Sequence, residues 1–295
     1  MRRVGWHVNA RHPADVFEER GRDQWRFIKS HLPDEWSFEG KRILDFGCGV
    51  GRVLRHAVAE DPEGEFWGCD IDTRSVEWLR GHLSPPAHIF QTGDWPPMQQ
   101  ADRHFDLIYA FSVFTHLVDS WSAWLLELHR VLKDDGVLIA TVFGPGHSSF
   151  AGESIDEDII GMNVLFPAAA WDAGGPLILH SEWWLRTHWG RAFEILELRP
   201  GEPAGPPPLF GQSVVVMRKR RGVFTTEELE CPQPDEPREL AALSQNVSSL
   251  EREVARHAVY LTSRSWKLTA PLRAMARGLR KRSRQRGGGP SQSGP

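Results

Sequence analysis

Cysteine is scarce in this 295-residue chain, whose three cysteines, Cys48, Cys69 and Cys231, form no Cys-x-x-Cys pair. A disulfide framework or a thiolate zinc site is therefore not expected, and the cysteine use fits a reducing cytoplasm. The acidic cluster at 153–158 has no histidine at ligand spacing, so we expect solvated carboxylates there and no metal.

Long apolar runs are missing as well. No stretch approaches the roughly 18 to 20 apolar residues of a membrane-spanning helix. No apolar core follows Met1-Arg2-Arg3, as a signal peptide would require. We therefore expect a cytoplasmic protein that at most attaches peripherally to the inner membrane.

Acidic residues are absent from 256–286, a segment that carries ten Lys and Arg. The formal charge of −4 for the whole chain thus hides a basic tail on an acidic body. Hydrophobic residues make up 40% of the chain and include 13 tryptophans, which is enough for a sizeable core.

Short apolar segments alternate with helical patterns through the first half of the chain. Such alternation indicates βαβ units and a doubly wound, Rossmann-like α/β sheet. The expected strands are 43–46, 65–70, 87–91, 105–111 and 137–143. The expected helices are 14–31, 50–59, 74–83 and 120–132.

Regularity lapses between residues 144 and 180, and we interpret this segment as an insertion that forms a lid. A helix at 181–191 and strands at 193–198 and 213–218 follow, and the loop between these strands is long enough for a hairpin. The expected organisation is an N-terminal helical segment (1–37), an α/β domain (38–221), a Pro-rich linker (222–238), a coiled coil with a basic amphipathic tail (239–286) and a disordered end (287–295).

The most informative segment is Asp45-Phe46-Gly47-Cys48-Gly49-Val50-Gly51, which begins at the end of the first expected strand. Its glycines let the backbone turn sharply and approach a ligand that a Cβ atom would obstruct. This spacing resembles motif I of the class I S-adenosylmethionine (SAM) dependent methyltransferases. The resemblance implies that Asp45 faces the methionine amino group and that Gly47, Gly49 and Gly51 allow the backbone to approach SAM.

An acidic residue ends the second expected strand, 25 positions after Asp45. A carboxylate there can accept hydrogen bonds from both ribose hydroxyls of an adenosine cofactor, and we favour Asp70 for this role. The alternative is that Asp70 or Asp72 only caps the next helix, for which Asp72 is the better placed.

Two further segments extend the resemblance to the same family. After the third strand, Asp94 would bind the adenine and Trp95 would pack beside it, although Gly93-Asp94 alone reads as an ordinary turn. At the end of the fourth strand, Phe111 or Ser112 would border the methionine moiety. The turn Leu132-Lys133-Asp134-Asp135-Gly136 is similar to the family's turn into its fifth strand, although relatives often carry two glycines there. Together these matches imply a seven-stranded sheet with the last strand antiparallel.

Methyl transfer from a sulfonium to a hydroxyl group benefits from a positioned base. His116, which follows the fourth strand, is our candidate, and a capping or packing role is an equal alternative. His180 and Glu182 are weaker candidates. The expected lid would place indole faces near the acceptor, of the kind on which sugar rings stack. They belong to Trp171, Trp183, Trp184 and Trp189.

The tail carries two patterns. Leu240, Leu243, Val247, Leu250 and Val254 follow the 3-4 spacing of a coiled-coil seam, which is compatible with a homodimer through residues 240–261. The segment 263–273 (SRSWKLTAPLR) resembles a C-terminal element of bacterial glycosyltransferases and methyltransferases of surface-polysaccharide assembly. Its basic amphipathic character suits an anionic membrane. We expect no nucleic-acid partner, because no nucleic-acid-binding fold is recognisable.

These features predict a SAM-dependent methyltransferase that O-methylates a sugar of a lipid-linked or nascent bacterial surface polysaccharide. One alternative is a small-molecule methyltransferase with a dimerising tail. Another is a non-catalytic SAM-binding adaptor in glycan assembly.

Overall fold

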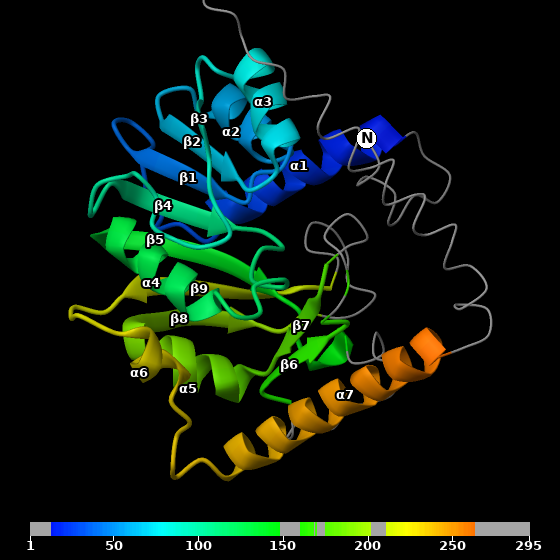
Figure 1. The fold of residues 1–295 in the computed structure, drawn as a ribbon. Coiled ribbons are helices and arrows are strands. Elements are labelled where there is room, and N and C mark those ends of the chain that lie inside the picture. The colour runs from blue at the N-terminus through cyan, green and yellow to red at the C-terminus, as the bar shows by residue number, and fades with distance from the viewer. Residues whose placement is uncertain (1–12, 148–159, 168, 170–174, 202–210, 263–295) are drawn as a thin grey trace, which may run out of the picture. The chain divides into compact units, whose positions relative to one another are not determined.

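The computed structural model of the chain describes residues 13–147, 160–167, 169, 175–201 and 211–262 (Figure 1). By its internal contacts the chain divides into two units, Met1–Asn246 and Val247–Pro295. Among the described residues, no helix is both long and apolar enough to cross a membrane.

A seven-stranded sheet forms the centre of the first unit, with the strand order β3-β2-β1-β4-β5-β9-β8. Only β9 runs against its neighbours, pairing antiparallel with both β5 and β8. The strands are β1 (Arg42–Phe46), β2 (Glu65–Asp70), β3 (His88–Gln91), β4 (Phe105–Ala110), β5 (Leu132–Val142), β8 (Phe193–Arg199) and β9 (Ser213–Lys219). The expected doubly wound, seven-stranded α/β sheet with its last strand antiparallel is confirmed.

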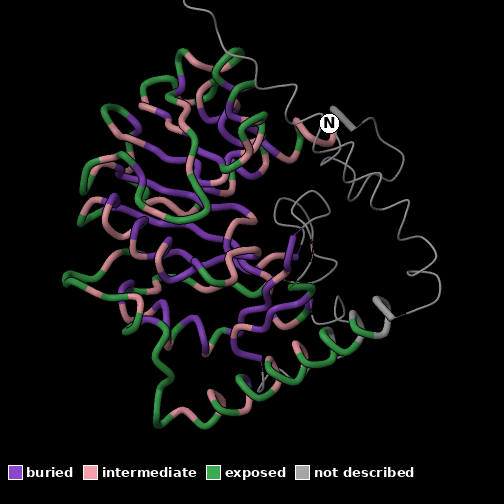
Figure 2. Tube along the Cα trace, viewed as in Figure 1, coloured by how far each residue is buried: buried purple, intermediate pink, exposed green. Residues whose placement is uncertain are grey.

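Helices cover both faces of this sheet, because alternate residues of each buried strand point to opposite sides. One face packs Ile43, Leu107 and Ile139 against Trp25 and Leu54. The other face packs Leu44, Ile108 and Leu138 against the helices at 121–131 and 182–192. Figure 2 shows the central strands as mostly buried. The helices are α1 (Pro13–Lys29), α2 (Leu54–Glu60), α3 (Thr73–His82), α4 (Trp121–Val131) and α5 (Glu182–Ala192).

The segment expected to be irregular contains a small second sheet. Strands β6 (Met162–Leu165) and β7 (Leu177–His180) pair antiparallel, so the expectation of no regular structure is wrong for these two strands. Each has only four residues, and the outer edges bond to distant segments. Ile178 N donates to Thr115 O, and His180 N donates to Phe143 O. Local periodicity does not predict such pairing.

The tryptophans expected to serve as sugar-stacking faces lie elsewhere. Trp184 and Trp189 belong to α5 and are buried in the main core, with relative exposures of 6% and 0%. Trp183 is half-buried beneath the guanidinium of Arg238. Trp171 and the acidic cluster at 153–158 lie outside the described residues. The buried tryptophans of α5 therefore do not support the expectation that their indole faces stack against an acceptor sugar.

The segment expected as a Pro-rich linker, 222–238, contains a helix that was not expected. It contains helix α6 (Thr226–Glu230), which a complete capping box at Thr225 and Glu228 begins. Leu229 of this helix is fully buried, and Arg191 donates to the carbonyl groups of Leu229 and Cys231. Residues 226–230 are thus packed on the α/β domain.

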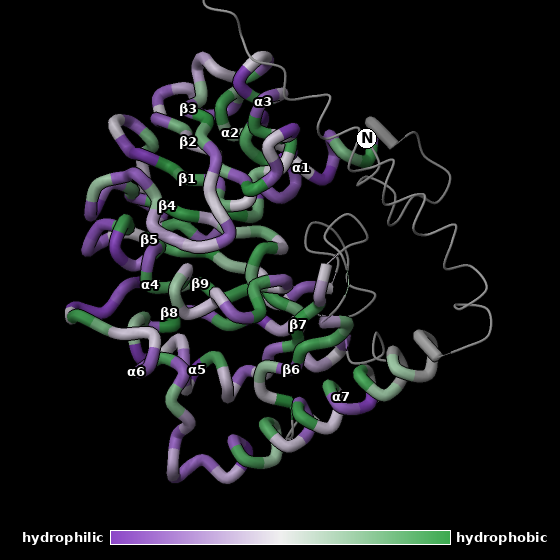
Figure 3. The backbone as a smooth tube through the Cα atoms, in the orientation of Figure 1, coloured by the Kyte–Doolittle hydropathy of each residue, from purple (hydrophilic) through white to green (hydrophobic). Residues whose placement is uncertain are grey.

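Helix α7 (Pro237–Thr262) is continuous through the predicted coiled coil, and its first turns belong to the first unit. Several apolar side chains of α7 are exposed. Figure 3 shows hydrophobic and hydrophilic residues alternating along this helix. Pairing of this seam with a second chain stays a prediction. Residues 263–295, with the basic tail and the expected disordered end, lie outside the described residues.

Candidate functional site

The acidic residues singled out in the sequence lie at one edge of the sheet. Asp45 and Asp70 stand near the carboxyl ends of the parallel neighbours β1 and β2, where Asp45 is in register with Gly68. Tyr109 of β4 is the partner of Asp45 on its other side. In open α/β sheets, ligands bind in the crevice outside these strand ends.

The glycine loop that follows β1 folds as the sequence predicts. Gly47 N and Cys48 N both donate to Cys69 O at 2.9 Å, which ties the loop to the end of β2. Gly49 has a φ of +53°, and a Cβ atom added to it would meet no atom within 4 Å. The space beside Gly49 is therefore open, as a ligand that approaches the backbone requires.

Asp70 is held in place by two backbone donors. Its Oδ2 accepts from Gly49 N at 2.7 Å, and its Oδ1 accepts from Asp72 N at 2.8 Å. A carboxylate offers about four acceptor positions, so each oxygen can accept one more hydrogen bond. Asp72 instead caps α3, accepting from Ser75 N at 3.3 Å. The prediction that Asp72 is the cap is confirmed, and the ribose role of Asp70 stays a prediction.

Asp45 is almost fully buried, with 4% of its surface exposed. Burial raises the pKa of its carboxyl to about 8, and the nearby Asp70 adds to the rise, whereas the Tyr109 hydroxyl and Arg52 oppose it. A cation that binds beside this carboxyl group favours its ionised form and lowers its pKa again. This property suits the ammonium group of an amino-acid moiety.

Arg52 is a residue that the sequence interpretation missed. It follows the last glycine of the loop, and burial lowers its pKa whereas the charge of Asp45 raises it. Its Nε is buried and has no hydrogen-bond partner among the described residues. The sequence does show a basic residue directly after Gly51, which could have identified Arg52. A cation at this position suits the carboxylate of the same amino-acid moiety.

Asp94 and Trp95 are both exposed in the loop after β3. The backbone carbonyl of Asp94 accepts from Trp124 Nε1 at 3.1 Å, which anchors the loop to α4. Trp95 remains 57% exposed. The side chains predicted to contact adenine are therefore accessible, and their role stays a prediction.

The end of β4 places Phe111 and Ser112 at the same edge of the sheet. Ser112 has a φ of +59°, and its N donates to Thr141 Oγ1 at 2.8 Å. Its hydroxyl bonds to the side-chain amide of Gln212. Phe111 is buried and packs edge-on against Tyr109. The strained backbone at Ser112, held by these hydrogen bonds of its N–H and hydroxyl groups, positions the loop that carries His116.

His116 lies half-buried four residues further on. Its Nδ1 is 2.6 Å from Pro176 O, just before β7. A carbonyl oxygen only accepts, so Nδ1 carries the proton and Nε2 is the basic nitrogen. His180 is fully buried instead, and burial lowers its pKa to about 3. His116 therefore remains the better candidate for a base.

SAM fits the residues at this edge of the sheet. Asp70 has two oriented oxygens for hydroxyl donors, and Gly49 leaves open space beside the backbone. Asp45 and Arg52 provide a carboxyl group and a guanidinium for the two ends of an amino acid. Among the described residues no group of three His, Cys, Asp or Glu could hold a metal ion.

Residues 44–138 match the model of a family described as a methyltransferase domain. The chain is 29% identical over 121 residues to a malonyl-[acyl-carrier protein] O-methyltransferase of Halalkalibacterium halodurans, covering 38% of this chain and 44% of that protein. It is 30% identical over 101 residues to a mitochondrial arginine hydroxylase of Mus musculus, covering 34% of this chain and 28% of that protein. The chain thus spans less than half the length of these curated relatives.

Among solved structures, an S-adenosylmethionine dependent methyltransferase from Mesorhizobium loti shares the fold. The TM-score is 0.52 at 18% identity, over 66% of this chain and 97% of that one. Residues 44–138 thus resemble a methyltransferase domain, and the chain shares the fold of the Mesorhizobium loti protein. The S-adenosylmethionine dependence of the Mesorhizobium loti protein agrees with SAM as the predicted cofactor.

Proposed function

We propose that this protein is a SAM-dependent methyltransferase directed at an oxygen atom. The observation that carries the proposal is the arrangement of Asp70 and the Gly47–Gly51 loop at the ends of β1 and β2, within the segment that matches the methyltransferase domain. The O-methyltransferase of Halalkalibacterium halodurans, which is similar to this chain over 121 residues, supports the choice of oxygen.

In this proposal one set of residues binds SAM and His116 transfers the proton. Asp70 holds the ribose, Asp45 and Arg52 hold the charged ends of the methionine moiety, and Asp94 with Trp95 borders the adenine. Bound SAM supplies a methyl group on a sulfonium, which is an intrinsically good leaving group. The protein therefore contributes mainly alignment and exclusion of water. The Nε2 of His116 accepts the proton of the acceptor hydroxyl, which is worth roughly 10²- to 10⁴-fold in rate.

The first experiment measures SAM binding by calorimetry with the full-length protein. Wild type is expected to bind, and Asp70→Ala is expected to bind much more weakly. Transfer of labelled methyl from SAM into a fractionated extract of the source cell then identifies the acceptor class. SAM binding without transfer into any fraction would favour the non-catalytic adaptor instead.

For the acceptor, the proposal is a sugar of a lipid-linked or nascent bacterial surface polysaccharide. The support is the resemblance of segment 263–273 to a C-terminal element of polysaccharide-assembly enzymes, together with the basic residues of 264–286. Peripheral attachment to an anionic leaflet goes with this proposal, since each basic residue near such a surface contributes about 1 kcal/mol.

Label in the glycolipid or polysaccharide fraction would support this acceptor, and label confined to soluble small molecules would contradict it. Co-sedimentation with vesicles that contain anionic lipid tests the attachment. Wild type should bind and a chain that ends at residue 262 should not.

Dimerisation through 240–261 is also proposed. In support, Leu240, Leu243 and Val254 of the seam are 72%, 55% and 68% exposed. Sedimentation of wild type against Leu243→Glu tests it. A dimer that this substitution dissociates supports the seam, and a monomeric wild type contradicts it.

A further inference from the structure

The root of helix α7, which we define as residues 237–246, packs on the α/β domain along one face. Glu239, Ala242 and Asn246 are spaced by three and four residues, so they lie in one stripe on the helix. The apolar seam residues Leu240 and Leu243 fall outside this stripe and remain exposed. The face that docks is thus distinct from the seam.

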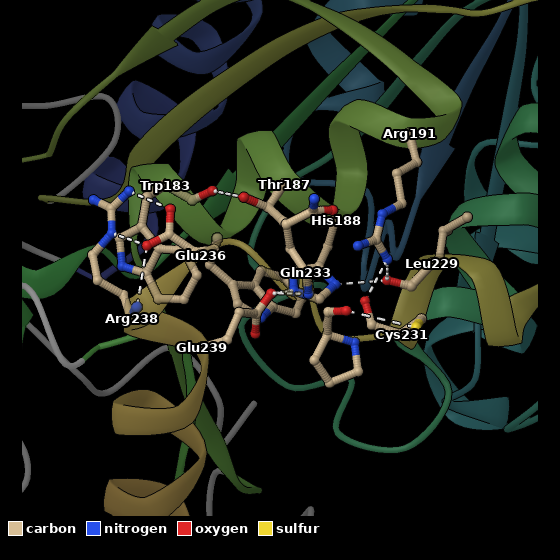
Figure 4. Close-up of polar contacts among 12 residues, drawn as sticks. Trp183, Thr187, His188, Arg191, Leu229, Cys231, Gln233, Glu236, Arg238 and Glu239 are labelled. Carbon is tan, nitrogen blue, oxygen red and sulfur yellow. Dashed lines mark hydrogen bonds and ion pairs between the residues drawn. The ribbon is translucent and has the colours of Figure 1, made fainter.

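Figure 4 shows the first point of attachment. Glu239 Oε1 lies 2.9 Å from His188 Nε2 and accepts from Gln233 N at 3.0 Å. The other ring nitrogen of His188 contacts Leu229 O at 2.6 Å. Next to it, the guanidinium of Arg238 lies 5.0 Å from the ring of Trp183. These contacts join α7 to α5 and α6.

The second point of attachment is the small β6–β7 sheet. Ala242 is 7% exposed and packs so closely on Gly161 that a Cβ atom added there would lie 2.9 Å from the Cβ of Ala242. One turn further, Asn246 Oδ1 accepts from Val164 N at 3.1 Å. The side chain of Asn246 thereby accepts from a donor on the outer edge of β6, beside which no strand lies among the described residues.

The opposite edge of this sheet holds the loop of His116. Val164 is the register partner of Ile178 on β7, and Ile178 N donates to Thr115 O at 2.9 Å. Two residues before Ile178, Pro176 O accepts from His116 Nδ1. A single line of contacts therefore runs from Asn246 across both strands to the loop that carries the candidate base.

We propose that Asn246 is a positioning residue that, through the β6–β7 sheet, holds the Pro176 carbonyl against His116 and so keeps the proton on Nδ1 and the base on Nε2. A two-stranded sheet of four-residue strands is marginal by itself and depends on contacts at its edges. The root of α7 is, on this inference, part of the acceptor side of the enzyme. The inference rests on the proposed function, since the tautomer matters only if His116 acts as a base.

The test reads the protonation of the His116 ring nitrogens directly by ¹⁵N NMR of the full-length protein, with His116→Gln to assign the signals. Wild type is expected to show the Nδ1–H tautomer. Asn246→Leu removes the acceptor at nearly constant volume and should lower the ratio of Nδ1–H to Nε2–H by roughly fivefold, which is what one ordinary hydrogen bond supports.

Two matched variants control this measurement. Asn246→Asp keeps an acceptor oxygen for Val164 N and should retain the wild-type tautomer ratio. Gln245→Leu changes the neighbouring amide, whose side chain has no hydrogen bond among the described residues, and should also retain it. If Asn246→Leu does not fold, Asn246→Ala replaces it in the same measurement.

An unchanged His116 ratio in a folded Asn246→Leu variant would overturn the inference, as would an equal change in Gln245→Leu. Calorimetry with SAM separates this result from the proposed function. All of these variants should bind SAM like wild type, because Asn246 acts on the acceptor side. A wild type that does not bind SAM would remove the proposed function, while the His116 spectrum would still decide whether α7 positions the ring.

Discussion

The cofactor side of the site and the acceptor side are built in different ways. On the cofactor side, residues 42–94, the functional residues lie at or just after the ends of their strands. The glycine loop there bonds to the end of the next strand along the chain, at Cys69 and Asp70. On the acceptor side, residues 112–117, 160–180 and 237–246, the contacts join segments 60 or more residues apart, such as His116 with Pro176 and Val164 with Asn246. The first side is therefore local and the second depends on the assembled domain.

Asp45 on the cofactor side and His180 on the acceptor side are both buried titratable groups, and they make stability depend on pH in opposite directions. Burial raises the pKa of Asp45 and lowers that of His180. Both shifts disfavour the charged form, which burial always does. A high pH therefore lowers the free energy of unfolding through Asp45, and a low pH lowers it through His180.

Replacing Asp45 by Asn tests the cofactor side and has the largest expected effect. The folded chain keeps the Asp45 proton up to about pH 8, whereas the unfolded chain releases it near pH 4. Stability therefore falls as pH rises between these values, at about 1.4 kcal/mol per unit at most. Between pH 5 and 7 wild type should lose about 3 kcal/mol more than Asp45→Asn in urea unfolding. Parallel losses would show that Asp45 is ionised in the folded chain.

Asp70 and Asp72 form a matched pair that separates binding from capping on the same side. Asp70→Ala should weaken SAM binding about 100-fold, since it removes two charge-assisted hydrogen bonds worth roughly 1.5 kcal/mol each. Asp72→Ala should leave SAM binding unchanged and cost about 1 kcal/mol of stability, as the loss of a helix cap does. Calorimetry and urea unfolding measure the two quantities. Equal SAM affinities in the two variants would contradict the ribose role of Asp70.

Replacing His180 by Leu tests the acceptor side. The unfolded chain takes up a proton at this residue near pH 6.5, but the folded chain does so only near pH 3. Wild-type stability therefore falls as pH drops through this range. From pH 7 to 5 it should lose about 2 kcal/mol more than His180→Leu. Urea unfolding at both values checks this, and identical slopes would mean that the ring is accessible to solvent protons.

Much of the fold could be predicted because its signals are local. The strand ends at Asp45 and Asp70 lie directly beside their glycine loop and helix cap, so spacing alone located them. The β6–β7 sheet could not be predicted in this way. Its strands have four residues each, and their edge donors bond to Asn246 and to Thr115 far along the chain. Helix α6 was missed because prolines around it read as a linker.

The candidate site divides along the same line. The glycine loop and the acidic strand ends were visible as a motif, but the approach of Arg52 to Asp45 was not, because charge pairing across a turn depends on packing. The tryptophans of α5 show the converse. Their aromatic character suggested ligand stacking, yet Trp184 and Trp189 fill the core between α4, α5 and the sheet, and composition cannot distinguish these two uses.

The sequence by itself determined the doubly wound sheet, the positions of its first five strands and the loop that follows β1. Hydrophobic periodicity and glycine spacing act over a few residues, where sterics leave few alternatives. Only the tertiary structure decided which nitrogen of His116 carries the proton and where the root of α7 docks. Those features depend on single hydrogen bonds between distant segments, which form only once the core has brought them together.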